Sequence, residues 1–209
     1  CSSDLSMYEI PNDNKFCIKL CEVSLSKVGI EQYQFLIERD YEINFFINKI
    51  PIGHQMDNDK VSYKSGIPLG YVKAKSNNAT ELGEKAKNEK EYYIYNHYKF
   101  KVFYNEDADI LTRGEPKKIV VGASIFPLSL DNLNEEIKCS PTGDYRYNSM
   151  IKKLKLDKNT LEKIVFTYDV EFEKTEIKYT SRWDFMLKAE DDKVHWRPII
   201  LSLVLTFIA

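Results

Sequence analysis

The chain has no excess of charge of either sign and contains little glycine. Its 30 Lys and Arg against 32 Asp and Glu give a formal net charge of -2. The basic stripe of a nucleic-acid-binding protein is therefore missing, and we expect no nucleic-acid partner. Only eight glycines stand against 14 Tyr and 11 Phe, which argues against a collagen-like chain and favours strands. Hydrophobic residues make up 43% of the 209 residues, enough to bury a core.

Motifs of the common catalytic and cofactor sites are also missing. The sequence contains no G-x-S-x-G, G-x-G-x-x-G, Walker-type loop, H-E-x-x-H or EF-hand spacing. The three histidines, His54, His97 and His195, lie far apart, and each suits a structural position. We therefore predict no catalytic residue, no cofactor and no metal site, and we expect no small-molecule substrate.

Four cysteines, Cys1, Cys17, Cys21 and Cys139, allow three complete disulfide pairings. On an extended strand Cys17 and Cys21 would lie roughly 13 Å apart, beyond the ~7 Å limit on the Cα–Cα separation in a disulfide. Either this segment bends into a turn, or each cysteine has a different partner, with Cys139 as the obvious candidate. Zinc is the competing interpretation, but a single C-x3-C pair does not favour it.

Asn78 is a candidate glycosylation site because it begins the triplet Asn-Ala-Thr within a polar stretch that predicts an exposed loop. The sequon, the cysteines and an apolar C-terminal run together favour a lumenal or extracellular domain. Lys193 and Arg197, immediately before that run, disagree with this orientation, since lumenal flanks are usually poor in Lys and Arg.

The run from Ile199 to Ala209 contains no charge. A spanning helix needs about 20 apolar residues, and this run stops near half that length. We expect a membrane helix that begins here and continues beyond Ala209; the alternative is a buried C-terminal strand or helix of a soluble domain. The expected division is a lumenal β-rich domain over 1–192 and, over 193–209, a membrane-interface segment with the start of the first transmembrane helix.

Hydrophobic periodicity predicts one early helix and several strands. The helix covers Ser26 to Asp40, with Ser26 as its N-cap. Val28, Tyr33, Leu36 and Ile37 recur at near-helical spacing in it. Strands are expected over 15–23, 41–48, 61–63, 92–104, 118–130 and 163–174. The last alternates most clearly, with an apolar face formed by Ile164, Phe166, Tyr168, Val170 and Phe172. This pattern predicts a mainly β chain, an antiparallel β-sandwich-like domain with one early α-helix.

The C-terminal third contains Ser181-Arg182-Trp183-Asp184 and then His195-Trp196, just before the apolar run. These motifs resemble the S-R-W-D and H-W signatures at the junction between the lumenal domain and the first helix in the nonaspanins, also called the transmembrane 9 superfamily or endomembrane protein 70. Further matches occur in the same order along the chain, at Gly66-Ile67-Pro68-Leu69-Gly70, Asn96-His97 and Cys139-Ser140-Pro141. Tyr179 departs from the pattern, because the family usually has Trp there.

The resemblance implies a non-enzymatic, multi-pass protein of Golgi and endosomal membranes, with this segment in the lumen. Such proteins assist the sorting of other membrane proteins, notably those with glycine-rich spanning helices. The implied partners are the lipid bilayer and membrane-protein clients. The residues themselves favour a structural role for the signature: Trp183 and Trp196 suit a membrane interface, and Arg182 can form an ion pair with Asp184.

Two other functions are compatible with the same residues. A single-span adhesion or receptor ectodomain would explain the sequon, the cysteines and the sheet, but not the signature order. A lumenal lipid-binding or hydrolytic β-domain would require a deep apolar cavity with convergent polar groups.

Overall fold

The computed structural model describes residues 13–55, 61–63, 66–74, 90–106, 118–131, 152–157 and 163–183, together with residues 200, 202, 204 and 206. Most of them lie in strands, and one α-helix stands near the start of the chain. The prediction of a mainly β chain with one early helix is thereby confirmed.

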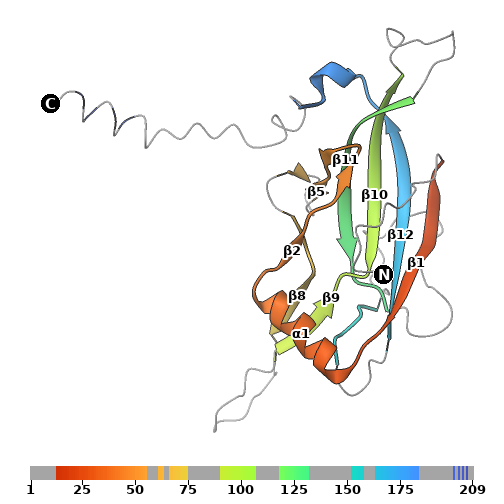
Figure 1. Ribbon diagram of the computed structural model, residues 1–209, viewed down its shortest axis with the longest axis vertical. Helices are drawn as coiled ribbons and strands as arrows, with labels where there is room; N and C mark the ends of the chain where they lie inside the picture. The colour runs from red at the N-terminus through yellow and green to blue at the C-terminus, as the bar shows by residue number, and fades with distance from the viewer. Residues whose placement is uncertain are drawn as a thin grey trace, which may run out of the picture.

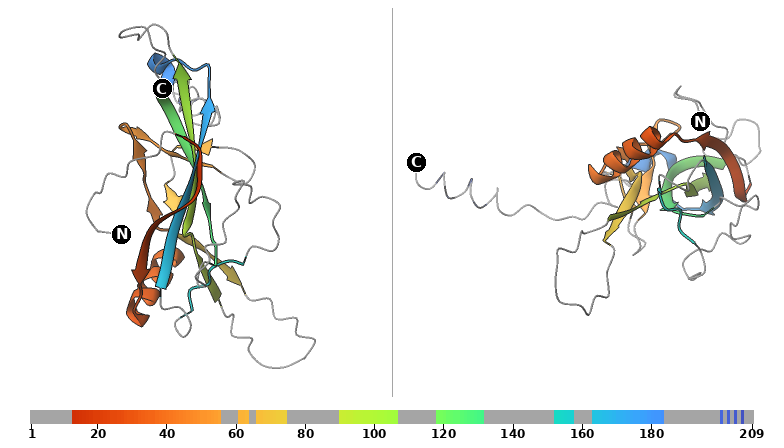
Figure 2. Two further views of the ribbon diagram at one scale, coloured as in Figure 1. Left: turned by 90° about the vertical axis from the view of Figure 1, so that its right-hand side faces the viewer. Right: turned by 90° about the horizontal axis from the view of Figure 1, so that it is seen from below.

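A six-stranded sheet forms the centre of the structure (Figure 1). In spatial order its strands are β1 (Lys15–Ser24), β12 (Lys163–Lys174), β10 (His97–Glu106), β11 (Lys118–Leu128), β5 (Gly53–Gln55) and β6 (Val61–Ser62). Three two-stranded pairs accompany it: β2 (Glu42–Ile43) with β7 (Ile67–Pro68), β3 (Phe46–Ile47) with β4 (Ile50–Pro51), and β8 (Gly70–Ala74) with β9 (Lys90–Ile94). The long strands run side by side along the long axis, and the helix lies at one end of them (Figure 2).

The central sheet is mixed, so the expected antiparallel arrangement is wrong for two of its pairings. β10 lies parallel to β12, and β11 lies parallel to β5. Alternation of apolar residues reports which face of a strand is buried and carries no information on strand direction. The long stretch of chain between β10 and β12, which includes the antiparallel β11, is ample for the crossover that a parallel pair requires. Packing of two sheets as a sandwich stays a prediction.

Two of the expected strands are each divided in two. The stretch 92–104 belongs to β9 and β10, which are separated at Tyr95 and Asn96. The stretch 41–48 contains β2 and β3, and β3 then turns back onto β4. Asn48 and Lys49 form this turn with positive φ angles of 48° and 65°, as two-residue hairpins with a right-handed twist require.

The α-helix α1 (Lys27–Glu38) begins as predicted, since the Ser26 hydroxyl accepts a hydrogen bond from the backbone N–H of Gly29 at 3.1 Å. Its buried face is centred on Ile30 and Ile37. Val28, which shares the apolar spacing of the helix, instead points to solvent and is 62% exposed. Periodicity therefore located the helix correctly but did not define which residues lie on its inner face.

Two clusters of buried side chains lie along the sheet. The first joins α1 to β9 and β12, and its members are Ile30, Ile37, Leu69, Ile94, Leu154, Leu156 and Ile164. The second lies between the central strands and the short pairs, and its members are Ile52, Ile67, Tyr98, Val102, Ala123, Ile125 and Val170. Burial of these aliphatic groups is the main force holding the short pairs to the sheet.

Close packing explains both glycines of the Gly66–Gly70 stretch. A Cβ atom on Gly66 would come within 2.9 Å of Glu42 Cβ, and one on Gly70 within 2.1 Å of the Tyr93 carbonyl oxygen. Glycine at these positions lets the chain cross β2 and then pair with β9 without a clash.

We predict that Gly70→Ala lowers the free energy of unfolding by about 1–3 kcal/mol, because the added methyl group forces β8 away from β9. Gly29→Ala is the matched control: its Cβ would make only ordinary contacts, the nearest at 3.5 Å, and alanine favours the helix by about 0.4–1 kcal/mol. Chemical denaturation of the purified protein measures both changes. Equal stability of the Gly70→Ala variant and the parent would contradict the packing described.

Candidate functional site

Four polar side chains with no solvent exposure lie at the centre of the sheet. Asn96, His97, Thr167 and Asp169, here called the polar cluster, are each 0% exposed. Asn96 directly precedes β10, and Thr167 lies opposite His97 in the parallel pairing of β10 with β12. Burial of polar groups costs free energy unless they find partners, so the contacts of these four residues decide what the cluster does.

Asn96 joins three segments of chain through its side-chain amide. Its Nδ2 donates to the carbonyl oxygens of Leu130 at 2.8 Å and Val165 at 3.1 Å. Its Oδ1 accepts from the backbone N–H of Leu130 at 2.8 Å. The amide therefore ties the residues that follow β11 to β12, next to the start of β10.

His97 and Asp169 connect the same region to β1. His97 Nδ1 lies 2.8 Å from the Thr167 hydroxyl oxygen, and Nε2 lies 3.4 Å from Asp169 Oδ2. The second separation is within ion-pair range and longer than an ordinary hydrogen bond. The other carboxylate oxygen of Asp169 accepts from the backbone N–H of Cys17 at 2.6 Å. A chain of polar contacts thus runs from β10 through β12 to the outer strand β1.

A hydroxyl, an imidazole and a carboxylate in this order also occur in nucleophilic catalytic sites. In such a site the hydroxyl must reach a substrate. Thr167, His97 and Asp169 are all fully buried in the sheet, which closes that route. The geometry therefore supports a structural role, in which the cluster holds three strands together.

The cysteines of β1 lie where that strand is irregular. Cys17 has a positive φ of 59°, and the register between β1 and β12 shifts on either side of the stretch Ile18–Lys19. Cys17 and Cys21 are both in disulfide bonds, so neither offers a thiolate to a metal. The strand is therefore not evenly extended. The separation of roughly 13 Å between Cys17 and Cys21 holds only for a regular extended strand. Their pairing stays a prediction, because Cys139 lies outside the described residues.

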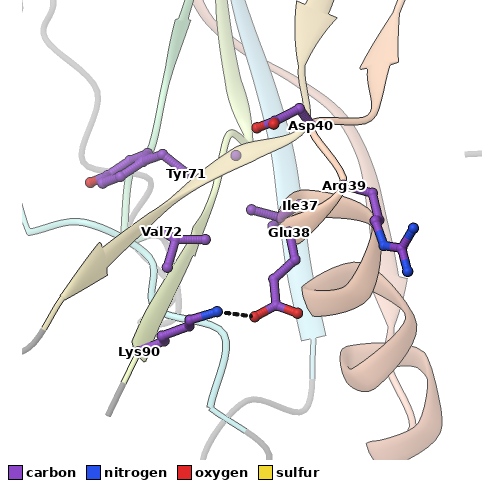
Figure 3. Close-up of a pocket in the computed structure, with 8 residues that line it drawn as sticks. Ile37, Glu38, Arg39, Asp40, Tyr71, Val72 and Lys90 are labelled. Carbon is purple, nitrogen blue, oxygen red and sulfur yellow. Dashed lines mark hydrogen bonds and ion pairs between the residues drawn. The ribbon is translucent and has the colours of Figure 1, made fainter. Parts of the chain in front are cut away.

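A pocket of about 550 Å³ lies between the end of α1 and β8 (Figure 3). Its lining carries charges of both signs, Glu38 and Asp40 as well as Arg39 and Lys90. Lys90 Nζ lies 2.9 Å from Glu38 Oε1, and the Tyr92 hydroxyl donates to the same carboxylate oxygen at 2.5 Å. Glu38 thus binds groups of its own chain and links α1 to β9. This pocket does not have the deep apolar character that a lipid-binding or hydrolytic domain would require.

The family signature begins in an exposed turn beyond β12. A 3₁₀ turn covers Tyr179–Ser181, and Arg182 and Trp183 follow it directly. The Arg182 guanidinium lies 3.9 Å from the ring centroid of Tyr179 and 5.9 Å from that of Trp183. We call Tyr179, Arg182 and Trp183 the aromatic turn. The ion pair expected between Arg182 and Asp184 stays a prediction, because Asp184 lies outside the described residues; no sequence motif indicates the ring contacts of the guanidinium.

Several predicted site residues lie outside the described part of the chain: Asn78, Cys139, Asp184, His195 and Trp196. Within the described part, His, Cys, Asp and Glu form no group of three or more that suits a metal ion. The helices described there also do not combine the length and apolar composition that a membrane span needs.

Comparison with known proteins decides the family. The family model described as endomembrane protein 70 matches residues 3–209. The chain belongs to the endomembrane protein 70 family. This confirms the nonaspanin resemblance.

Relatives in this family are named as transmembrane proteins. Transmembrane 9 superfamily member 12 of Arabidopsis thaliana is 30% identical over 231 residues, which cover 98% of this chain and 33% of the relative. Member 11 of the same plant is 30% identical over 224 residues, covering 94% and 32%. Member 4 of Homo sapiens is 28% identical over 215 residues, covering 94% and 31%. The chain thus spans about a third of the length of these relatives, and no solved structure matches it.

We predict that Thr167→Val lowers the free energy of unfolding by about 1–3 kcal/mol, since it removes the partner of His97 Nδ1 inside the sheet at nearly constant volume. Thr180→Val in the exposed turn is the control and is expected to change it by less than about 0.5 kcal/mol. Denaturant titration of both variants provides the comparison. If the two values are indistinguishable, the polar cluster does not stabilise the sheet.

Glu38 also perturbs a neighbouring phenol. The hydrogen bond that Tyr92 donates to the Glu38 carboxylate raises the pKa of Tyr92 to about 12, because the carboxylate stabilises the neutral phenol and repels the phenolate. Glu38→Gln should therefore lower the pKa of Tyr92 towards 10. Glu91→Gln serves as the control, because Glu91 is hydrogen-bonded to Tyr93 and Lys155 instead. The measurement is a pH titration of ¹³C-labelled tyrosine by NMR, with Tyr92 assigned from Tyr92→Phe; an unshifted pKa in Glu38→Gln would disprove the contact.

Proposed function

We propose that this chain is the lumenal domain of a nonaspanin-type protein that assists the sorting of other membrane proteins in the Golgi and endosomes. Membership of the endomembrane protein 70 family over residues 3–209 is the observation that carries the proposal. The bilayer and membrane-protein clients are its partners in this proposal, and it performs no catalysis.

Two observations support a lumenal position for residues 1–192, and a third supports the membrane segment that follows them. Cys17 and Cys21 are disulfide-bonded, and disulfides persist in oxidising compartments such as the lumen of the secretory pathway. Asn78 stands in a glycosylation sequon. Ile200 and Val204, in the apolar C-terminal run, have helical backbone and are 58% and 49% exposed. Exposed aliphatic side chains on a helix suit a lipid environment, in line with a membrane segment over 193–209.

The non-catalytic part of the proposal is supported by the polar cluster. Its hydroxyl, imidazole and carboxylate are the groups in the described sheet that most resemble a catalytic relay, and all three are fully buried. Their contacts join β10, β12 and β1. A rigid lumenal body of this kind suits a scaffold that holds or orients a client.

The test is a sorting assay in cells that lack the full-length protein. A reporter with a glycine-rich spanning helix is expected to leave the Golgi–endosome system and accumulate elsewhere, and expression of the full-length protein should restore its location. A matched reporter with the same ends and a leucine-rich span is the control and should be sorted normally throughout. Quantitative microscopy against organelle markers gives the readout.

Identical location of both reporters in the presence and absence of the protein would contradict the sorting role. The lumenal position has its own readout: Asn78→Gln should remove one glycan from the full-length protein, seen as a loss of the mobility shift on enzymatic deglycosylation. Full-length protein with a single span followed by a short cytoplasmic tail would favour the adhesion or receptor alternative instead.

A further inference from the structure

The aromatic turn exposes two large rings close to one cation. Tyr179 is 37% exposed and Trp183 is 51% exposed, and the Arg182 guanidinium contacts both rings. Such contacts align the guanidinium with the rings and leave its N–H groups free to donate at the edge. Lys178 adds a second exposed cation just before the turn. The turn therefore presents cationic donors next to exposed aromatic surface.

The turn is attached firmly to the end of the sheet. The backbone N–H of Thr175 donates to the Tyr104 carbonyl oxygen at 2.8 Å, and Asn105 Nδ2 donates to the Ile177 carbonyl oxygen at 2.6 Å. Both contacts tie the chain leaving β12 to the end of β10. The turn lies at the end of the molecule opposite α1, as the blue helical segment and the orange helix show in Figure 1.

The turn lies close in sequence to the proposed membrane anchor. Trp183 precedes Ile199, where the uncharged run begins, by only 16 positions. Even a fully extended chain of that length reaches no more than about 55 Å. The turn is thus the described surface nearest in sequence to the proposed membrane segment.

We propose that the aromatic turn binds the headgroups of membrane phospholipids, with Arg182 donating to the lipid phosphate and the rings of Tyr179 and Trp183 seated at the headgroup level. This inference rests on the proposed membrane anchoring. Tyr and Trp favour the membrane interface because their rings are apolar and their O–H or N–H remains hydrated. The planar guanidinium matches two phosphate oxygens at once, and basic residues are attracted to anionic lipid surfaces.

A second arginine–aromatic contact provides a matched control within the same domain. Arg39 at the end of α1 lies 5.1 Å from the ring centroid of Phe35, and Phe35 is 56% exposed. The chemistry is similar, but this pair lies at the opposite end of the sheet (Figure 1). If lipid binding depends on where the turn lies in the molecule, lipid should contact the aromatic turn and not the Arg39–Phe35 pair. Unspecific adhesion of lipid would contact both.

The experiment uses full-length protein in nanodiscs of phosphatidylcholine and phosphatidylserine at 4:1, doped with a phosphatidylcholine that carries a photoreactive headgroup. After illumination, lipid adducts are mapped on peptides by mass spectrometry. We expect adducts on the peptide containing residues 179–183 and none on the peptide containing residues 35–39. Arg182→Ala should lower the adduct yield about fivefold, Arg182→Lys should retain part of it, and Arg39→Ala should leave it unchanged.

The inference is overturned if Arg182→Ala labels as strongly as the parent protein, or if the turn is unlabelled while other peptides carry lipid. Crosslinks from the turn to other segments of the protein would overturn it as well, since they would identify a protein contact. The sorting assay separates this result from the proposed function: normal sorting with an unlabelled turn refutes only the lipid contact, and a labelled turn without sorting refutes only the sorting role.

Discussion

The parallel pairing of β10 with β12 is the contact on which the rest of the sheet depends, and the polar cluster is matched in the observed register of this pairing. His97 lies opposite Thr167, and Asp169, two residues further on the same face, reaches the other imidazole nitrogen. A shift of one residue would turn the partners of His97 to the opposite face and leave an imidazole buried without them, at a cost of about 1–3 kcal/mol. The same shift would also turn the apolar residues of β12, which provide most of the burial energy, away from the core. Both sets of residues therefore specify the register.

The polar cluster also contacts β1, the strand at the edge of the sheet. Asp169 accepts the backbone N–H of Cys17 at 2.6 Å, in a part of β1 whose backbone departs from regular strand geometry. Cys17 is also held covalently by a disulfide bond. The hydrogen bond to Asp169 ties the irregular segment of β1 to β12, and the disulfide adds a covalent constraint at the same position of β1.

Hydrophobic periodicity predicted where the helix and the strands lie, but it did not predict which polar residues are buried or how the strands pair. The alternation over 163–174 identified β12 with its observed bounds, because an apolar face of period two is visible in sequence. The sequence pattern carried no prediction for the opposite face, on which Thr167 and Asp169 are fully buried. Both contact His97, some 70 positions away. The sequence pattern also did not indicate which strands pair in parallel. The irregular part of β1 at Cys17 contacts Asp169, which is far away in the sequence. The pair Asn96-His97 was found only through family resemblance, and nothing in its local sequence indicated its place in the core.

The central sheet sets the distance between the two ends of the domain. β12 contains 12 residues and so spans roughly 36 Å at about 3.3 Å per residue, with α1 near one end and the aromatic turn beyond the other. Hydrogen bonds attach the turn to β10, and a buried cluster packs Ile30 and Ile37 of α1 with Ile164 of β12, so both ends are fixed to the central sheet. If the turn lies on the bilayer surface as proposed, the sheet sets the height of the α1 end above the membrane.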